Sequence, residues 1–233
     1  MVWSALKLKK YIAPIESAKA KGDFDAERAA ISDVCSEWVN WLMDHYNTTM
    51  EITGQENIPE EACVFIANHQ GYCDVMAMLK ATEGKQISFI AKDALKKIPV
   101  LHDWIYRARG LMIPTNGDTR ESLRVINQGV EYVKQGFSLV IFPEGRRSWG
   151  PNMNEFKPGS FKLATKAKAP LVPVTISGTY KIYEEHEKIT SGQHVVVKIH
   201  PAIETANLSK EELHELPDRV HKIIEDALPK IDG

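Results

Sequence analysis

Long apolar runs are missing from this chain of 233 residues. No stretch approaches the roughly 18–20 consecutive apolar residues that span a bilayer, so we expect no transmembrane helix. The N-terminus also lacks the apolar core and the small-residue cleavage site of a signal peptide, because Lys7, Lys9 and Lys10 interrupt it. We therefore expect the chain to stay in the cytosol.

Cysteine and net charge are also scarce. The three cysteines, Cys35, Cys63 and Cys73, are an odd number without a CxxC spacing, which argues against a disulfide framework. A structural zinc site is disfavoured too, because it needs four ligands. His69 and Cys73 are the one close His/Cys pair in the sequence, and there is no second pair to complete the set. The formal net charge of -2 excludes a general attraction to polyanions, so nucleic acid is a poor candidate partner. Any anionic ligand must be held by a local cluster of Lys and Arg.

Apolar residues make up 43% of the chain, which is enough for one substantial core. From about residue 51, short apolar runs alternate with helical stretches, and this pattern predicts an α/β fold with a mixed central sheet flanked by helices. The predicted strands are residues 63–67, 87–91, 111–113, 138–142, 171–177 and 195–199. Pro173 lies inside the fifth of these runs and suggests an edge strand or a bulge there, not the centre of the sheet.

Two helices carry clear start signals. Asp118 with Glu121 three residues later predicts a helix that ends at Gly136. Ser209 with Glu212 forms a capping-box pattern and begins the last helix, in which Pro217 is a candidate kink.

Two amphipathic helices are predicted before the sheet, as an N-terminal appendage. Residues 3–20 mix Trp3 and other apolar side chains with lysines, a composition suited either to an anionic surface or to packing on the domain. Residues 24–46 repeat apolar residues at helical spacing, and Trp38 and Trp41 there suit either the lipid headgroup region or the core. We expect residues 1–50 to form a membrane-docking segment and residues 51–233 the main domain.

A first chemical motif, Asn68-His69-Gln70-Gly71-Tyr72-Cys73-Asp74, follows an apolar run and so lies at the carboxyl end of a strand, where open α/β sheets place active sites. An aspartate five positions after a histidine can hold one imidazole nitrogen while the other nitrogen accepts a proton. No serine or cysteine sits in a nucleophile elbow, so such a base would act on a hydroxyl of the substrate. The bland alternative is that His69 and Asp74 cap a helix; metal binding ranks lower, and Cys73 is expected to be a small packed residue.

A second motif, residues 142–148, follows another predicted strand. Gly145 permits a sharp turn, while Arg146 and Arg147 present planar groups that match a phosphate, and Glu144 can orient them or a substrate hydroxyl. The alternative is a surface loop whose arginines are solvated.

Two further basic residues are candidates for an anion site. Lys92 follows a predicted strand, and Arg120 lies in the first turn of a predicted helix, where a cation is unfavourable unless it faces an anion. For both residues the alternative is an ordinary solvated side chain.

The order and spacing of Asn68-His69-x4-Asp74, residues 142–148 and Val172-Pro173-Val174 resemble the 1-acyl-sn-glycerol-3-phosphate acyltransferase family, over about residues 51–205. The resemblance implies that His69 and Asp74 are the catalytic dyad and that Glu144, Gly145 and Arg147 bind the glycerol phosphate of the acceptor. It also implies that Val172–Val174 shapes the acyl or core side. Two departures stand out: no basic residue follows the run 110–113, which leaves Arg120 as the substitute, and Arg146 replaces a usual threonine.

The resemblance implies an enzyme that moves a fatty acyl group from acyl-CoA or acyl carrier protein to the sn-2 hydroxyl of lysophosphatidic acid, giving phosphatidic acid. Lys92 or a backbone N–H would stabilise the oxyanion. No cofactor or metal is implied, and the enzyme would act peripherally on the cytoplasmic face of a membrane. The alternatives are an acyltransferase for glycerol 3-phosphate or another lysophospholipid, a thioesterase in which His69 activates water, and a non-catalytic lipid-binding module.

Overall fold

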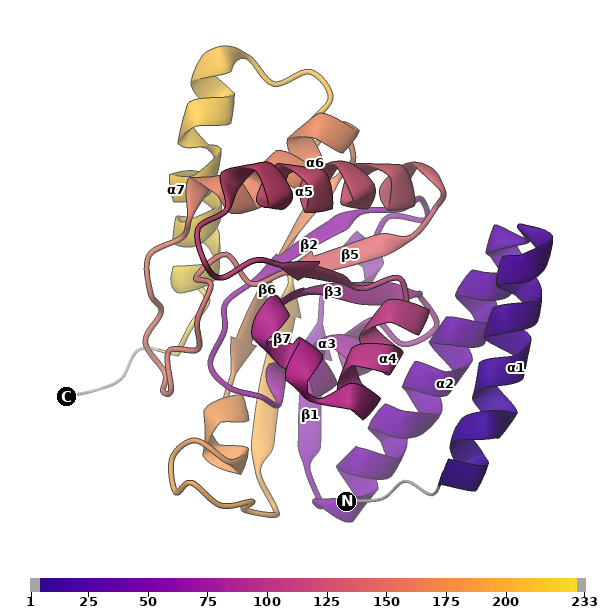
Figure 1. The fold of residues 1–233 in the computed structure, drawn as a ribbon. Helices are drawn as coiled ribbons and strands as arrows, with labels where there is room; N and C mark the ends of the chain where they lie inside the picture. The colour runs from indigo at the N-terminus through magenta and orange to yellow at the C-terminus, as the bar shows by residue number, and fades with distance from the viewer. Residues whose placement is uncertain (1–4, 230–233) are drawn as a thin grey trace.

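A computed structural model describes residues 5–229, without the side chains of residues 5–9 and 99–100, and one central sheet organises it. Within that range seven strands pair in the order β1-β7-β6-β2-β5-β3-β4 (Figure 1). Their bounds are β1 (Thr49–Thr53), β2 (Val64–Ala67), β3 (Ile87–Lys92), β4 (Leu111–Ile113), β5 (Ser138–Ile141), β6 (Leu171–Ser177) and β7 (His194–Ile199). All neighbours run parallel except β6 and β7, which are antiparallel. The predicted mixed sheet flanked by helices is confirmed.

Helices cover both faces of this sheet (Figure 1). They are α1 (Ala5–Lys21), α2 (Phe24–His45), α3 (Asp74–Ala81), α4 (Pro99–Arg107), α5 (Thr119–Lys134), α6 (Lys162–Ala167) and α7 (Lys210–Glu225), with short 3-10 turns η1 (Gln55–Asn57), η2 (Asp93–Lys97), η3 (Pro158–Phe161) and η4 (Thr179–Ile182). Alternate residues of a strand face opposite sides, so Val64 and Ile66 of β2 pack with α5, α6 and α7, whereas Phe65 packs with α2 and α3. Burial on both faces explains why β2 and β5 are continuous apolar runs.

The helix start signals operate as predicted. Asp118 caps α5 by accepting a hydrogen bond from the Glu121 backbone N–H at 2.9 Å. Ser209 and Glu212 make both bonds of the capping box at the start of α7, and Pro217 lies inside that helix.

Pro173 is in the sheet interior, because β6 lies between β7 and β2. The expectation of an edge strand is therefore wrong. No bulge interrupts β6 itself, which pairs with β2 in unbroken register from Leu171 to Val174. The extra residue lies in the segment after β7, where residues 200–202 stand opposite Val172 and Pro173. The irregular pairing at this point tolerates a residue that has no backbone N–H.

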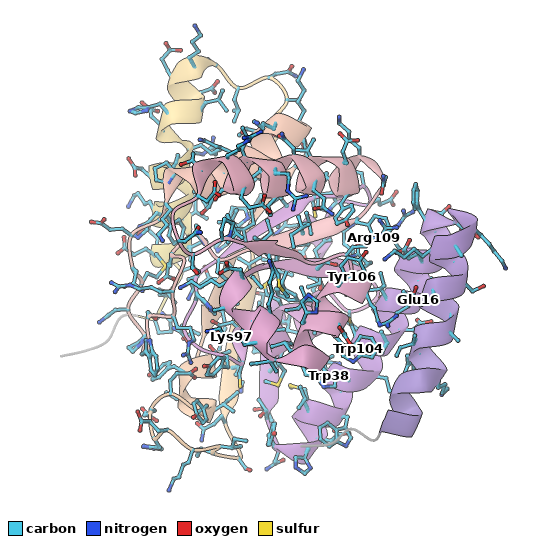
Figure 2. All side chains as sticks on the ribbon, in the orientation of Figure 1. Glu16, Trp38, Lys97, Trp104, Tyr106 and Arg109 are labelled. Carbon is cyan, nitrogen blue, oxygen red and sulfur yellow. The ribbon has the colours of Figure 1, made fainter. Side chains whose placement is uncertain are left out.

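The N-terminal helices share the core of the main domain. Trp38 and Trp41 of α2 are half-buried against the cluster that covers the sheet. Of the two alternatives, the lipid headgroup region and the core, these side chains therefore pack against the core. Glu27 of α2 is fully buried and receives two hydrogen bonds, at 2.6 and 2.7 Å, from Arg109, which precedes β4. Figure 2 shows Arg109 beside α1 and α2. The docking role of residues 1–50 stays a prediction, and Trp3 lies outside the described residues.

No helix in residues 5–229 combines the length and the apolar character needed to span a bilayer.

Candidate functional site

The carboxyl ends of three parallel strands meet at one edge of the sheet. β2 pairs with both β5 and β6, and all three run in the same direction. The segment after β2 carries His69, the segment after β5 carries Arg147, and the segment after β6 begins with Gly178 and Thr179. Residues more than 70 positions apart in the chain therefore come together at this edge.

His69 and Asp74 are in direct contact. Asp74 begins α3 and is fully buried, and its Oδ2 lies 2.7 Å from His69 Nδ1. The same oxygen accepts the Gly71 N–H at 2.9 Å, and the Thr179 hydroxyl donates to Oδ1. The Nδ1–H tautomer follows from this network, and it leaves Nε2 as the proton acceptor. Within the described residues no group hydrogen-bonds to Nε2, and the His69 side chain is 20% exposed.

The loop after β5 is clamped against the His69 loop. The ring of Phe142 stacks on the imidazole, with 4.2 Å between centroids. The Ser148 N–H donates to the His69 carbonyl at 2.7 Å, and the Trp149 N–H donates to the Gln70 carbonyl at 3.2 Å. Because the backbones are tied as well as the rings, the two sequence motifs form one rigid unit.

Glu144 has a different position from the one expected. It is buried, one carboxylate oxygen accepts the His69 backbone N–H at 2.6 Å, and the other accepts two hydrogen bonds from Asn154, at 2.7 and 2.8 Å. Burial raises the pKa of Glu144 above its ordinary value even though these donors oppose the rise. Both oxygens are engaged below the surface by protein donors, so the expected contact of Glu144 with substrate stays a prediction. Its carboxylate holds the His69 backbone in place.

The two arginines of this loop differ. Arg147 is sandwiched between the rings of Tyr72, at 3.6 Å, and Trp149, at 4.2 Å, and it forms an ion pair with the buried carboxylate of Glu184 at 2.8 Å. Arg146 is exposed and makes one hydrogen bond, to Asn154 at 3.2 Å. Arg147 is thus held rigidly with its charge already paired, whereas Arg146 is open to an incoming anion.

The turn at Gly145 needs glycine. Its φ is +68°, and a Cβ there would lie 2.6 Å from Nζ of Lys157. The same contact places the ammonium group of Lys157, an exposed residue that sequence reasoning left out of the site, over this loop.

The sequence model of the acyltransferase family matches residues 49–177, more than half of the chain and the whole of this site up to the end of β6. The chain belongs to the acyltransferase family. Among its relatives is the 1-acyl-sn-glycerol-3-phosphate acyltransferase of Saccharomyces cerevisiae, 31% identical over 185 residues, which are 78% of this chain and 60% of the yeast protein. The enzyme of the same name from Borreliella burgdorferi is 29% identical over 77% of this chain and 70% of its own length.

A solved structure extends the likeness to the fold. The crystal structure of the 1-acyl-sn-glycerophosphate (LPA) acyltransferase PlsC from Thermotoga maritima matches with a TM-score of 0.74 at 26% identity. The match covers 96% of this acyltransferase and 94% of the Thermotoga chain. The chain spans 60% of the yeast relative, 38% of a chloroplast relative from Brassica napus and 43% of one from Arabidopsis thaliana. The activities of these longer proteins are therefore carried over only as a proposal.

Lys92 and Arg120 lie apart from the dyad in the acyltransferase. Lys92 ends β3, and Arg120 is in the first turn of α5, which follows β4 at the edge of the sheet. Both are exposed, and neither side chain makes a hydrogen bond or ion pair with another described residue. They share the carboxyl edge of the sheet with His69, and the structure does not bring them into contact with it.

Sequence reasoning missed Thr179 and Glu184. Besides pairing with Arg147, Glu184 accepts the Tyr72 N–H at 2.8 Å, and a Cβ on Gly71 would lie 2.2 Å from its Oε2. Glu184 therefore ties the first motif to the second and requires a glycine beside it. The signal that points to both residues is the end of the strand that contains Pro173, because active sites gather at carboxyl ends of parallel strands.

Cys73 has the inert character of a packed residue. Burial, with the nearby charges of Glu184 and Asp74, raises the pKa of its thiol to about 12. The thiolate is therefore scarcely populated at neutral pH, which disfavours Cys73 as a nucleophile although it lies within the motif.

Proposed function

We propose that this acyltransferase moves a fatty acyl group from an acyl thioester to the sn-2 hydroxyl of lysophosphatidic acid, producing phosphatidic acid. The observation that carries the proposal is the state of His69: Nδ1 is anchored by a buried carboxylate that accepts two more hydrogen bonds, and Nε2 is free to accept a proton. The names of the yeast, Borreliella and Thermotoga relatives support the choice of acceptor.

In the proposed reaction, Nε2 of His69 removes the proton from the acceptor hydroxyl as its oxygen attacks the thioester carbonyl. The new C–O bond forms, the C–S bond breaks, and the proton on His69 passes to the departing sulfur. The protons and charges balance without a metal or prosthetic group. A direct transfer of this kind fits the inert thiol of Cys73, because no acyl-enzyme is needed.

The phosphate of the acceptor is proposed to bind at the loop after β5. Arg146 is exposed there, Lys157 lies over the same turn, and Arg147 is held between two aromatic rings beside them. Lys92 or a backbone N–H is the proposed oxyanion donor. The donor thioester is proposed to be on coenzyme A or acyl carrier protein, and the enzyme to work peripherally on the cytoplasmic face of a membrane.

The test is an assay of purified protein with labelled acyl thioester and lysophosphatidic acid. His69→Ala is expected to lower kcat/KM by about 10²–10⁴-fold, the usual contribution of a general base. His214→Ala, which changes an exposed histidine on α7, is the matched control and should retain the parental rate. Equal activity of the parent and His69→Ala would exclude the mechanism.

Two further outcomes separate the alternatives. Release of free thiol at the full rate without an acceptor would make the protein a thioesterase. A preference for glycerol 3-phosphate or for a lysophospholipid with a headgroup, in a panel of acceptors, would move it to a sister acyltransferase.

A further inference from the structure

The segment formed by η2 and α4 is rich in apolar side chains that stay exposed. Ile98 is 50% exposed, Leu101 40% and Tyr106 61%, and no side chain described in η2 or α4 is buried. Single exposed apolar residues are ordinary, but three within nine positions on one short helix and its lead-in indicate a surface that something else covers.

Lysines flank these apolar side chains at both ends of the segment. Lys96 and Lys97 directly precede Ile98 and are exposed. Of the nearby acidic residues, Asp93 accepts two hydrogen bonds from Thr115, and Glu121 is paired with Arg124. Asp103 of α4 is exposed beside His102, so the lysines at the two ends of the segment carry its positive charge. In a chain whose formal net charge is -2, this is a local cationic site, and its partner is expected to be anionic.

Packing on the inner side holds the exposed side chains outward. Trp104 packs against the buried cluster that includes Ile15 of α1 and Ile31 of α2, and Figure 2 shows it on the part of α4 that faces those helices. At the same end, Tyr106 receives the Lys19 ammonium at 4.5 Å from its ring centre, so the surface continues onto α1. Lys97 lies towards the opposite end of the segment (Figure 2).

This surface lies beside the proposed catalytic edge. The segment leaves the sheet at the carboxyl end of β3, and β3 is separated from β2 by β5 alone. Phe89 of β3 stacks with Phe142 at 6.2 Å between centroids, and Phe142 stacks on His69. Strands are about 4.8 Å apart, so the exit of β3 is about 10 Å from that of β2.

We propose that Lys96, Lys97, Ile98, Leu101 and Tyr106 form a docking surface for an anionic lipid bilayer, one that presents the His69 edge to the membrane. Apolar side chains interleaved with lysines suit the headgroup region, where the apolar groups insert and the ammonium groups meet lipid phosphates. The proposal rests on the proposed function in one respect: substrate and product of that reaction reside in a bilayer.

The test is co-sedimentation of the full chain with vesicles, without substrate. Vesicles contain either phosphatidylcholine alone or about 30% phosphatidylglycerol, at about 0.1 M salt. Ile98→Glu/Leu101→Glu is expected to weaken binding to the anionic vesicles by about tenfold or more, because it replaces inserting groups with repelled ones. Lys96→Glu/Lys97→Glu is expected to weaken it by about 30-fold, and this loss should shrink on phosphatidylcholine alone.

Leu213→Glu is the matched control, because Leu213 of α7 is also 40% exposed. It should bind vesicles as the parent does, and circular dichroism melts should show all variants folded. Parental binding by both double variants would overturn the proposal, as would an equal loss in Leu213→Glu. Binding of an acidic carrier protein in place of vesicles would overturn it too. Failure of the proposed function gives a different result from failure of the docking surface. In that case the parent binds vesicles through this surface but does not acylate lysophosphatidic acid.

Discussion

The substitution Asp74→Asn tests the charge of the carboxylate separately from its geometry. The Gly71 N–H is a fixed donor 2.9 Å from Oδ2, so the amide oxygen of an asparagine must take that place. It then still accepts from Gly71 and from His69 Nδ1, while its NH2 group faces the Thr179 hydroxyl, which can rotate to accept. The tautomer of His69 survives, and only the negative charge is lost.

The expected loss follows from the charge that forms on His69 during proton transfer. Two unit charges about 4 Å apart attract by about 4 kcal/mol at an effective dielectric constant of 20 and by about 1 kcal/mol in water. Asp74 is fully buried and the His69 side chain is 20% exposed, so an intermediate value of about 2–3 kcal/mol applies. Asp74→Asn should therefore lower kcat/KM by about 30- to 200-fold.

Steady-state kinetics with an acyl thioester and lysophosphatidic acid measure this loss, with urea unfolding as a check on stability. Asp74→Ala removes charge and orientation together, so it should fall further, towards His69→Ala. Should Asp74→Asn be as slow as Asp74→Ala, the reasoning from the Gly71 donor is refuted. A rate within about threefold of the parent would show that the charge plays no part.

Three further predictions concern stability and the thiol. Glu27→Gln removes the carboxylate partner of Arg109, whose side chain is 12% exposed, so it should cost about 3–5 kcal/mol and lower Tm by about 6–20 °C. Glu37→Gln on the exposed side of α2 should change Tm little, and equal melting of the two variants would contradict this. Burial lowers the pKa of His200 to about 4, so the unfolded chain, with a pKa near 6.5, takes up a proton first as pH falls. The contribution of neutral His200 to the free energy of unfolding is full above pH about 6.5 and declines towards pH about 4, by about 2 kcal/mol between pH 8 and pH 5. His200→Gln should remove this part of the pH dependence of urea unfolding. An unchanged dependence of the unfolding free energy on pH would count against it. Iodoacetamide at pH about 8 should leave the activity intact, and Cys73→Ala should stay within about threefold of the parent; rapid inactivation that substrate prevents would reveal a reactive thiol.

Glu27 also bears on how the docking role of residues 1–50 can be tested. Deleting the first two helices would expose the apolar side of the sheet that α2 covers and would strand Arg109 without its partner. Loss of vesicle binding in such a deletion could then reflect unfolding. Point substitutions on exposed side chains avoid this problem.

Local signals determined most of the elements. The caps at Asp118 and Ser209 act within one helical turn, and the strands buried on both faces are runs of apolar residues. Both kinds of signal are written in neighbouring residues, so the sequence alone was sufficient. β1 was missed because alternate residues of this edge strand are exposed, and its five residues include two threonines and a glutamate.

The sequence by itself determined the order of the motifs and the pairing of His69 with Asp74, because five residues of separation allow one turn of chain to bring them together. Only the tertiary structure decided that Thr179 and Glu184 complete the site, that Glu144 supports a backbone, and that Arg147 is already paired. These contacts join residues up to 112 positions apart. They depend on β6 and β5 lying on either side of β2, and no local periodicity or spacing encodes which strands become neighbours.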